Sequence, residues 1–166
     1  MDADEPGWAL LDDFFRGEAE DRATATARRY ERVRHRLVHY LDTADVADAL
    51  GTGPAALLEA ERQFHEHGAF WILLGPDDLV CCLAGFLEPP WLPAGRAEGQ
   101  AQVSLVGRLV AHLRRRRLVD EALLGCVLHD TERALARARR RVEGLTELGE
   151  DEVVQQQPGR SGGGQQ

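Results

Sequence analysis

The amino-acid sequence predicts an all-α fold, a single helical-bundle-like domain of six or seven helices. Apolar residues recur at three- and four-residue spacing through most of the chain, as they do on the buried face of an amphipathic helix. Glycine–proline pairs and acidic capping residues separate these segments. Only the run at 69–74 (AFWILL) suits a strand, and one strand alone makes no sheet.

Four helices are expected in the first half of the chain. The second carries the clearest buried stripe, in which Tyr30, Val33, Leu37 and Leu41 follow helical spacing. Either Thr43 or Asp45 can cap the third, and proline suits the first turn of the fourth. These helices are expected over residues 8–16, 24–41, 45–50 and 54–67.

Three more helices are expected in the second half. Asp77 and Asp78 would lie at the positive end of the first, and the Pro89–Pro90 pair would end it. The proline-rich loop 88–99 is expected to be irregular. Asp120 can cap the last helix. In the long helix before it, Leu109 lies in the middle of the apolar stripe. The expected ranges are 76–88, 100–117 and 121–141.

A chain of 166 residues with 43% apolar composition can bury one core. The domain is expected over residues 8–146, with residues 1–7 and the Gln/Gly-rich residues 147–166 disordered. The N-terminus is acidic rather than basic, and no apolar run approaches the roughly 18 residues of a membrane helix. A cytoplasmic protein with no membrane contact and with reduced cysteines is therefore expected.

All twenty basic residues are arginine, and the chain contains neither lysine nor asparagine. The codons for those two residues are rich in A and T. The composition therefore indicates a high-GC bacterium as the source.

The formal net charge of −8 is divided into blocks of opposite sign. In residues 22–41 six arginines stand against one glutamate, which gives +5, and in residues 108–120 five arginines stand against one aspartate, which gives +4. Two helices should therefore carry basic faces that contact either phosphates or a protein partner. The candidate contact residues are Arg28, Arg29, Arg32 and Arg36 on the first helix and Arg114, Arg115, Arg116 and Arg117 at the end of the second. Arg29, Arg32 and Arg36 are expected to lie opposite the buried stripe of the first helix.

No catalytic, cofactor or metal motif is complete. The pairs His35/His39, His65/His67 and Cys126/His129 could each supply two metal ligands at most. Cys126 is expected to be a small core residue. No nucleophile elbow and no glycine-rich phosphate loop is present. The sequence therefore predicts a protein that is not an enzyme and that holds neither a cofactor nor a metal.

Two segments resemble the N-terminal SAM-like core-binding domain of tyrosine recombinases, the phage integrases. They are LLDDFFRGEAEDRATATARRYERVRHRLVHYLD (10–42) and VSLVGRLVAHLRRRRLVDEALL (103–124). The first has a short Leu/Phe helix, then a Thr-rich helix start, a tyrosine and a basic outer face. The resemblance implies an accessory module that contacts the DNA backbone through the candidate arginines. The catalytic half of that family is absent, so no strand cleavage is implied.

Two functions follow as expectations. The first is a helical protein-interaction or structural module that pairs its charged faces with a protein partner or with a second copy. The second is an accessory module that binds double-stranded DNA. The acidity of the whole chain favours the first, because DNA-binding domains are typically basic.

Overall fold

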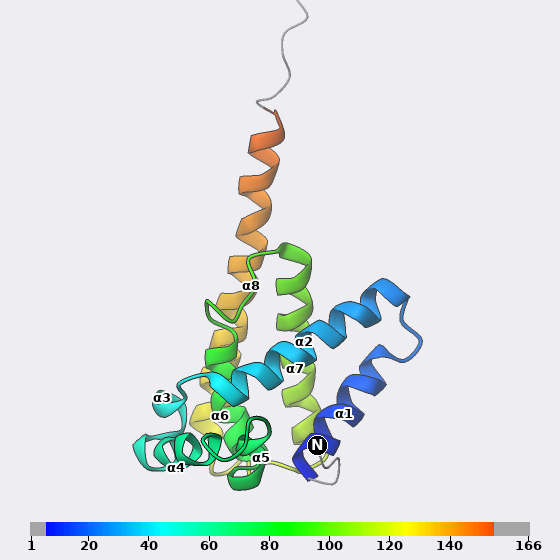
Figure 1. The fold of residues 1–166 in the computed structure, drawn as a ribbon. Coiled ribbons are helices and arrows are strands. Elements are labelled where there is room, and N and C mark those ends of the chain that lie inside the picture. The colour runs from blue at the N-terminus through cyan, green and yellow to red at the C-terminus, as the bar shows by residue number, and fades with distance from the viewer. Residues whose placement is uncertain (1–5, 155–166) are drawn as a thin grey trace, which may run out of the picture.

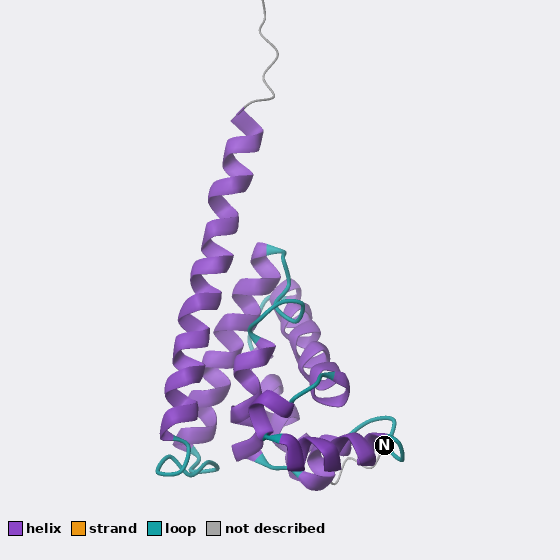
Figure 2. Cartoon of the chain, turned by 90° about the vertical axis from the view of Figure 1, so that its left-hand side faces the viewer, coloured by secondary structure: helices purple, strands orange, loops and turns teal. Residues whose placement is uncertain are grey.

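A computed structural model describes the backbone of residues 6–154 and the side chains of residues 7–144. Within those limits the chain is all-α, as predicted, and contains no strand (Figure 2). It has eight helices rather than six or seven. They are α1 (Pro6–Ala19), α2 (Thr24–Thr43), α3 (Ala47–Leu50), α4 (Thr52–Arg62), α5 (Ala69–Leu73), α6 (Pro76–Phe86), α7 (Arg96–Arg115) and α8 (Gly125–Val154).

The ends of the domain differ from the expected boundaries. The first helix already begins at Pro6, and α8 continues past residue 147 to Val154. The remaining parts of the segments expected to be disordered, 1–5 and 155–166, lie outside the described residues.

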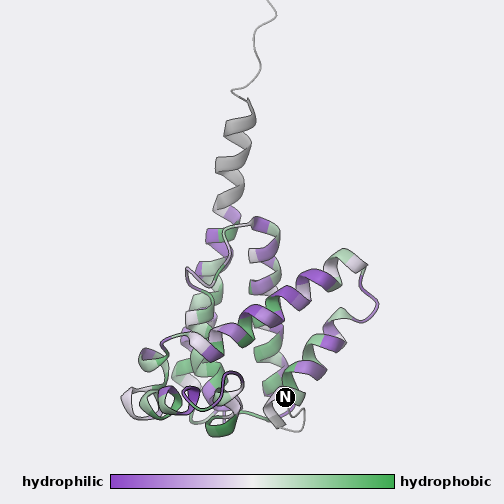
Figure 3. Ribbon diagram, viewed as in Figure 1, coloured by the Kyte–Doolittle hydropathy of each residue, from purple (hydrophilic) through white to green (hydrophobic). Residues whose placement is uncertain are grey.

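The long helix α7 is the centre of the bundle (Figure 1). It packs against α8 on one side and against α2, which crosses it obliquely, on another. The helix α6 packs on α8, and α1 packs on α2. Hydrophobic residues are concentrated in α5, α6 and the lower half of α7, whereas α2 is mostly hydrophilic (Figure 3).

Most of the predicted core positions on α2 and α7 are confirmed, although Tyr30 is only half-buried. Leu37 of α2 and Leu109 of α7 are each 1% exposed, and Val33, Leu41 and Leu113 are buried with them. These residues lie where the stripes of α2 and α7 face the same core. Helical periodicity alone was sufficient to find them.

The segment after α4 departs from the prediction, because α4 ends at Arg62 and does not continue toward Gly68. Residues 63–68 turn back to α2, where the Gly68 N–H donates to Asp42 Oδ1 at 3.0 Å. The guanidinium of Arg62 donates to the carbonyls of Leu41 and Ala44 at 2.7 and 2.9 Å. It thereby satisfies acceptors at the C-terminal end of α2.

The run 69–74, the one candidate strand, is instead the short helix α5. Gly68 precedes it with φ +88°, a left-handed conformation that suits glycine. The Trp71 N–H then donates to the Gly68 carbonyl at 3.0 Å, and the Leu74 N–H to Phe70 at 2.9 Å. With no second strand to pair with, the segment satisfies its backbone groups within its own turn.

Asp120 does not cap α8 directly. Its carboxylate accepts hydrogen bonds from the N–H groups of Ala122 and Leu123, in a turn that ends before α8 begins at Gly125. The Asp120 N–H in turn donates to Asp77 Oδ1 at 3.0 Å, which ties this turn to the start of α6. None of the helices in the described part of the chain is both long and apolar enough to span a bilayer.

Candidate interaction surfaces

Three arginines of α2 converge on one carboxylate of α7, that of Glu98. Arg29 Nε lies 3.4 Å from Glu98 Oε1, Arg32 forms two hydrogen bonds to the carboxylate, and Arg36 Nη2 lies 4.0 Å away. The prediction that these arginines lie opposite the buried stripe of α2 was wrong. They lie beside the stripe, because residue 29 is only about 40° around the helix from Val33 at 100° per residue.

Behind this cluster lies Gln102, whose side chain is fully buried. Its oxygen accepts a hydrogen bond from Arg36 Nη1 at 2.9 Å. Its amide nitrogen donates to the carbonyls of Phe86 and Trp91 at 2.8 and 3.1 Å. The basic face of α2 is therefore anchored to α6, α7 and the loop between them.

The cluster keeps an excess of positive charge. Hydrogen bonding from Arg32 is the main reason why the pKa of Glu98 lies below its usual range, so this carboxylate stays charged at neutral pH. Three guanidiniums and one carboxylate leave two positive charges. Arg28, on the same face of α2, is exposed and has no carboxylate within 4.0 Å among the described side chains.

The second group of candidate arginines lies at the other end of α7. Arg114 pairs with Glu121 at 3.0 Å, whereas Arg115, Arg116 and Arg117 are exposed. Eighteen residues of helix separate Glu98 from Arg116, which corresponds to about 27 Å at 1.5 Å per residue. The two basic clusters therefore do not form one surface.

The histidine and cysteine pairs do not assemble either. Within the described side chains, no group of three histidine, cysteine or carboxylate residues is placed to hold a metal ion. His35 and His65 each lie near a glutamate one turn earlier, at 3.2 and 3.1 Å. The expectation of a buried Cys126 was wrong, since this residue is exposed at the start of α8. Burial raises the pKa of the Cys82 thiol to about 12, which makes it a poor nucleophile.

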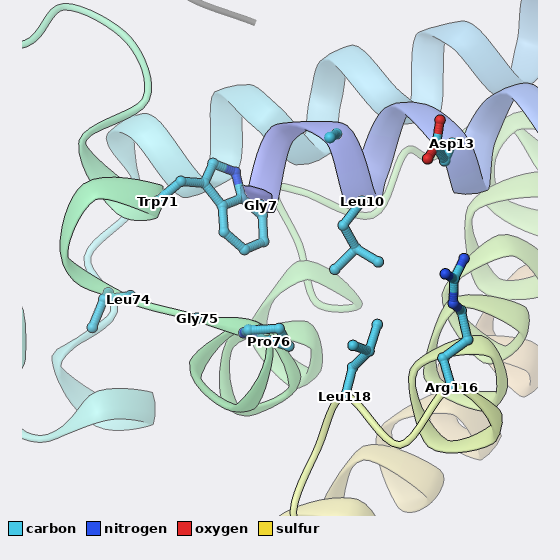
Figure 4. Close-up of a pocket in the computed structure, with 10 residues that line it drawn as sticks. Gly7, Leu10, Asp13, Trp71, Leu74, Gly75, Pro76, Arg116 and Leu118 are labelled. Atoms are coloured by element: carbon cyan, nitrogen blue, oxygen red, sulfur yellow. The ribbon is translucent and has the colours of Figure 1, made fainter. Parts of the chain in front are cut away.

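A cavity of about 460 Å³ opens between α1, the α5–α6 junction and the segment that follows α7. Its walls are mainly apolar (Figure 4). Two charged side chains, Asp13 from α1 and Arg116 from the end of α7, lie at the same end of it. The lining residues are Gly7, Ala9, Leu10, Asp13, Trp71, Leu74, Gly75, Pro76, Arg116 and Leu118.

One wall of the cavity depends on the absence of a side chain at Gly7. The six-membered ring of Trp71 lies so close to this residue that a Cβ atom there would be 2.1 Å from Trp71 Cε3. Trp8 contacts the same indole edge-on, with ring centroids 6.4 Å apart. Trp71 of α5 thus packs directly against the start of α1.

The large apolar side chains that the described chain leaves exposed belong to the same end of the molecule. In Figures 1 and 2 this end, which we call the base, is formed by α4, α5 and the α7–α8 connection. Leu118 is 39% exposed and lines the cavity. The exposed set is Leu57, Phe64, Ile72, Leu73, Leu118 and Leu123.

No sequence pattern predicted this cavity, although Arg116 was one of the candidate contact residues. Its walls come from three segments that are far apart in the chain, and no local pattern predicts that they meet. No family model matches this chain, and neither a curated protein nor a solved structure matches it. The resemblance to a recombinase core-binding domain therefore rests on the residues of the two segments alone.

Proposed function

We propose that the protein is a self-associating interaction module and that its docking surface is the cavity at the base. The observation that carries this proposal is an apolar cavity of about 460 Å³ whose lining includes the partly exposed Leu118. The apolar side chains that line the open cavity remain in contact with water, and apolar area in water costs about 25 cal/mol per Å². Covering the rim with a second protein surface removes that cost.

The composition of the rim supports a protein partner. Interfaces typically have an apolar centre, often with an aromatic side chain, surrounded by polar and charged groups. At the base Leu10, Trp71 and Leu118 form the apolar part, and Asp13 and Arg116 supply charges of both signs at its edge. A rim with both charges complements a copy of itself.

The test is the mass of the protein in solution, measured by light scattering and by sedimentation over a wide range of concentration. We expect the wild type to be dimeric at about 100 µM, well above a micromolar dissociation constant. Replacement of Leu118 with Asp places a charge at the apolar centre and should raise the dissociation constant at least about tenfold.

Leu57→Asp is the matched control. This leucine of α4 is also exposed, at 65%, but it does not line the cavity. It should leave the dissociation constant within about threefold of the wild type, because Leu57 lies outside the proposed docking surface. A wild type that stays monomeric up to about 1 mM would reject the proposal.

Binding of duplex DNA is a second candidate function. The observation that favours it is the excess of positive charge around Glu98, together with the exposed Arg28 on the same face, which pairs with no carboxylate among the side chains of residues 7–144. Guanidiniums in such an arrangement can neutralise phosphates, and binding of this kind weakens steeply with salt. The salt dependence of duplex affinity is therefore its test.

A further inference from the structure

We infer that two copies of the chain pair base to base about a twofold axis, with Asp13 of each copy facing Arg116 of the other. This inference rests on the proposed self-association and specifies its geometry. The two residues come from different elements, α1 and the end of α7, and lie at one end of the cavity in Figure 4.

Both side chains are available for such a pairing. Asp13 is 62% exposed, and its ion pair is with Arg16 on its own helix, 3.2 Å away. An exposed pair of this kind, three residues apart, is only weakly stabilising, so it competes little with a partner in a second copy. Arg116 is exposed and has no carboxylate within 4.0 Å in the part of the chain whose side chains are described.

The signs of these charges are compatible with twofold symmetry. In a twofold dimer, if residue i of one copy contacts residue j of the other, then j also contacts i. A surface that carries one acid and one base can therefore form two equal ion pairs at once. Any register that placed Asp13 against Asp13, or Arg116 against Arg116, would be opposed by like-charge repulsion.

The apolar part of the surface is consistent with the same arrangement. Leu118 lies two residues after Arg116, and Leu10 lies three residues before Asp13 on the same helix. Each ion pair would thus lie beside the leucines that line the cavity. Partial burial strengthens charge pairs at such an edge, because the effective dielectric constant is lower than in water.

A charge exchange between copies tests the pairing. Asp13→Arg and Arg116→Asp each replace two attractive contacts with two repulsive ones, so each variant alone should raise the dissociation constant by at least about tenfold. An equimolar mixture of the two variants should recover dimers with an affinity within about threefold of the wild type, because each contact in the mixed dimer again joins opposite charges.

The mixture separates pairing between copies from pairing within one. If Asp13 and Arg116 interacted only within a chain, the double variant would recover and the mixture of single variants would not. Arg115→Asp is the matched control, since this exposed neighbour of Arg116 does not line the cavity and should change little.

The outcomes also distinguish this inference from the proposed function. A wild type that dimerises and is disrupted by Leu118→Asp, but whose mixed variants fail to recover, keeps the docking surface and overturns the twofold pairing. Assemblies larger than a dimer would overturn it as well, because head-to-tail contacts do not close on themselves in pairs. A monomeric wild type would overturn both.

Discussion

At the scale of single residues, Gln102 connects more of the fold than any charged side chain of the basic face. It is 0% exposed, and its amide bridges Arg36 of α2 to two backbone carbonyls at and beyond the end of α6. A buried amide of this kind is stabilising only while all its partners are satisfied. Its removal would take away the donor that both carbonyls share, at a site that is buried at Phe86 and partly buried at Trp91.

We therefore expect Gln102→Ala to lower the free energy of unfolding by roughly 2–4 kcal/mol, since each unsatisfied buried group costs about 1–3 kcal/mol. Gln100→Ala is the control, because Gln100 is exposed on the same helix. It should change stability by less than about 0.5 kcal/mol. Urea unfolding followed by circular dichroism measures both. Equal effects at the two positions would show that the hydrogen bonds of Gln102 contribute little.

The burial of single residues was predicted correctly where their position in a helical repeat determines which way they face. Leu37 and Leu109 are buried as expected, because helical spacing places them in the middle of an apolar stripe. Cys126 is exposed although Val127 and Leu128 follow it, because consecutive residues on a helix point 100° apart. The role of Glu98 as the partner of the α2 arginines was not predicted, since those arginines are more than sixty residues earlier in the chain.

At the scale of elements, the contact between α1 and α5 fixes one wall of the cavity. It requires glycine at position 7, since the Trp71 ring occupies the space of a side chain there. The large indole is itself packed against Trp8 and Phe70, with ring centroids 6.4 and 5.0 Å away, so it has little room to move.

Gly7→Ala should therefore displace α1 from α5 and lower stability by about 1–3 kcal/mol, as overpacking of a core does. Intrinsic tryptophan fluorescence, to which Trp8 and Trp71 both contribute, and a thermal melt will detect the change. Gly17→Ala is the matched control on the same helix, where a Cβ atom would meet nothing within 4 Å. It should stabilise by roughly 0.5–1 kcal/mol, because alanine is the better helix former. A loss of stability in the control instead would mean that α1 does not tolerate alanine in general.

The elements themselves were predictable to different extents. Long helices with capping residues and a periodic stripe were found, because the pattern extends over several turns. The short helix α5 was the candidate strand, since a run of six apolar residues has no period that distinguishes the two states. The segment is helical because Gly68 adopts a left-handed conformation and the chain turns back to Asp42 before it. Both features depend on tertiary contacts.

At the scale of the whole molecule, charge segregation was visible in the sequence but its geometry was not. The α2 cluster and residues 114–117 lie near opposite ends of α7, so they cannot act as one basic face. The net charge of −8 also opposes the approach of a polyanion. The α2 cluster, where three arginines surround one glutamate, is the surface on which duplex binding is to be tested.

If the α2 arginines contact phosphates, the double change Arg28→Gln with Arg32→Gln should reduce the slope of log affinity against log salt by about two units, since each neutralised phosphate contributes about −0.9. These two arginines are more exposed than Arg29 and Arg36, which remain to hold Glu98. Fluorescence anisotropy with a labelled duplex of about 20 base pairs measures the slope. Arg115→Gln with Arg117→Gln, at the far end of α7, should leave it unchanged.

The substitution Glu98→Gln should change duplex affinity in the opposite direction and provides a second, independent test. The amide keeps a hydrogen-bond acceptor for Arg32 but removes the one negative charge in the cluster, so duplex affinity should rise and the slope should steepen by up to about one unit. A merely structural role of the arginines predicts no such gain, because the substitution would only weaken the contact between α2 and α7. Absence of duplex binding by the wild type and by Glu98→Gln at about 50 mM salt, where screening extends over roughly 14 Å, would rule out the DNA-binding alternative and leave the base as the interaction surface of this protein.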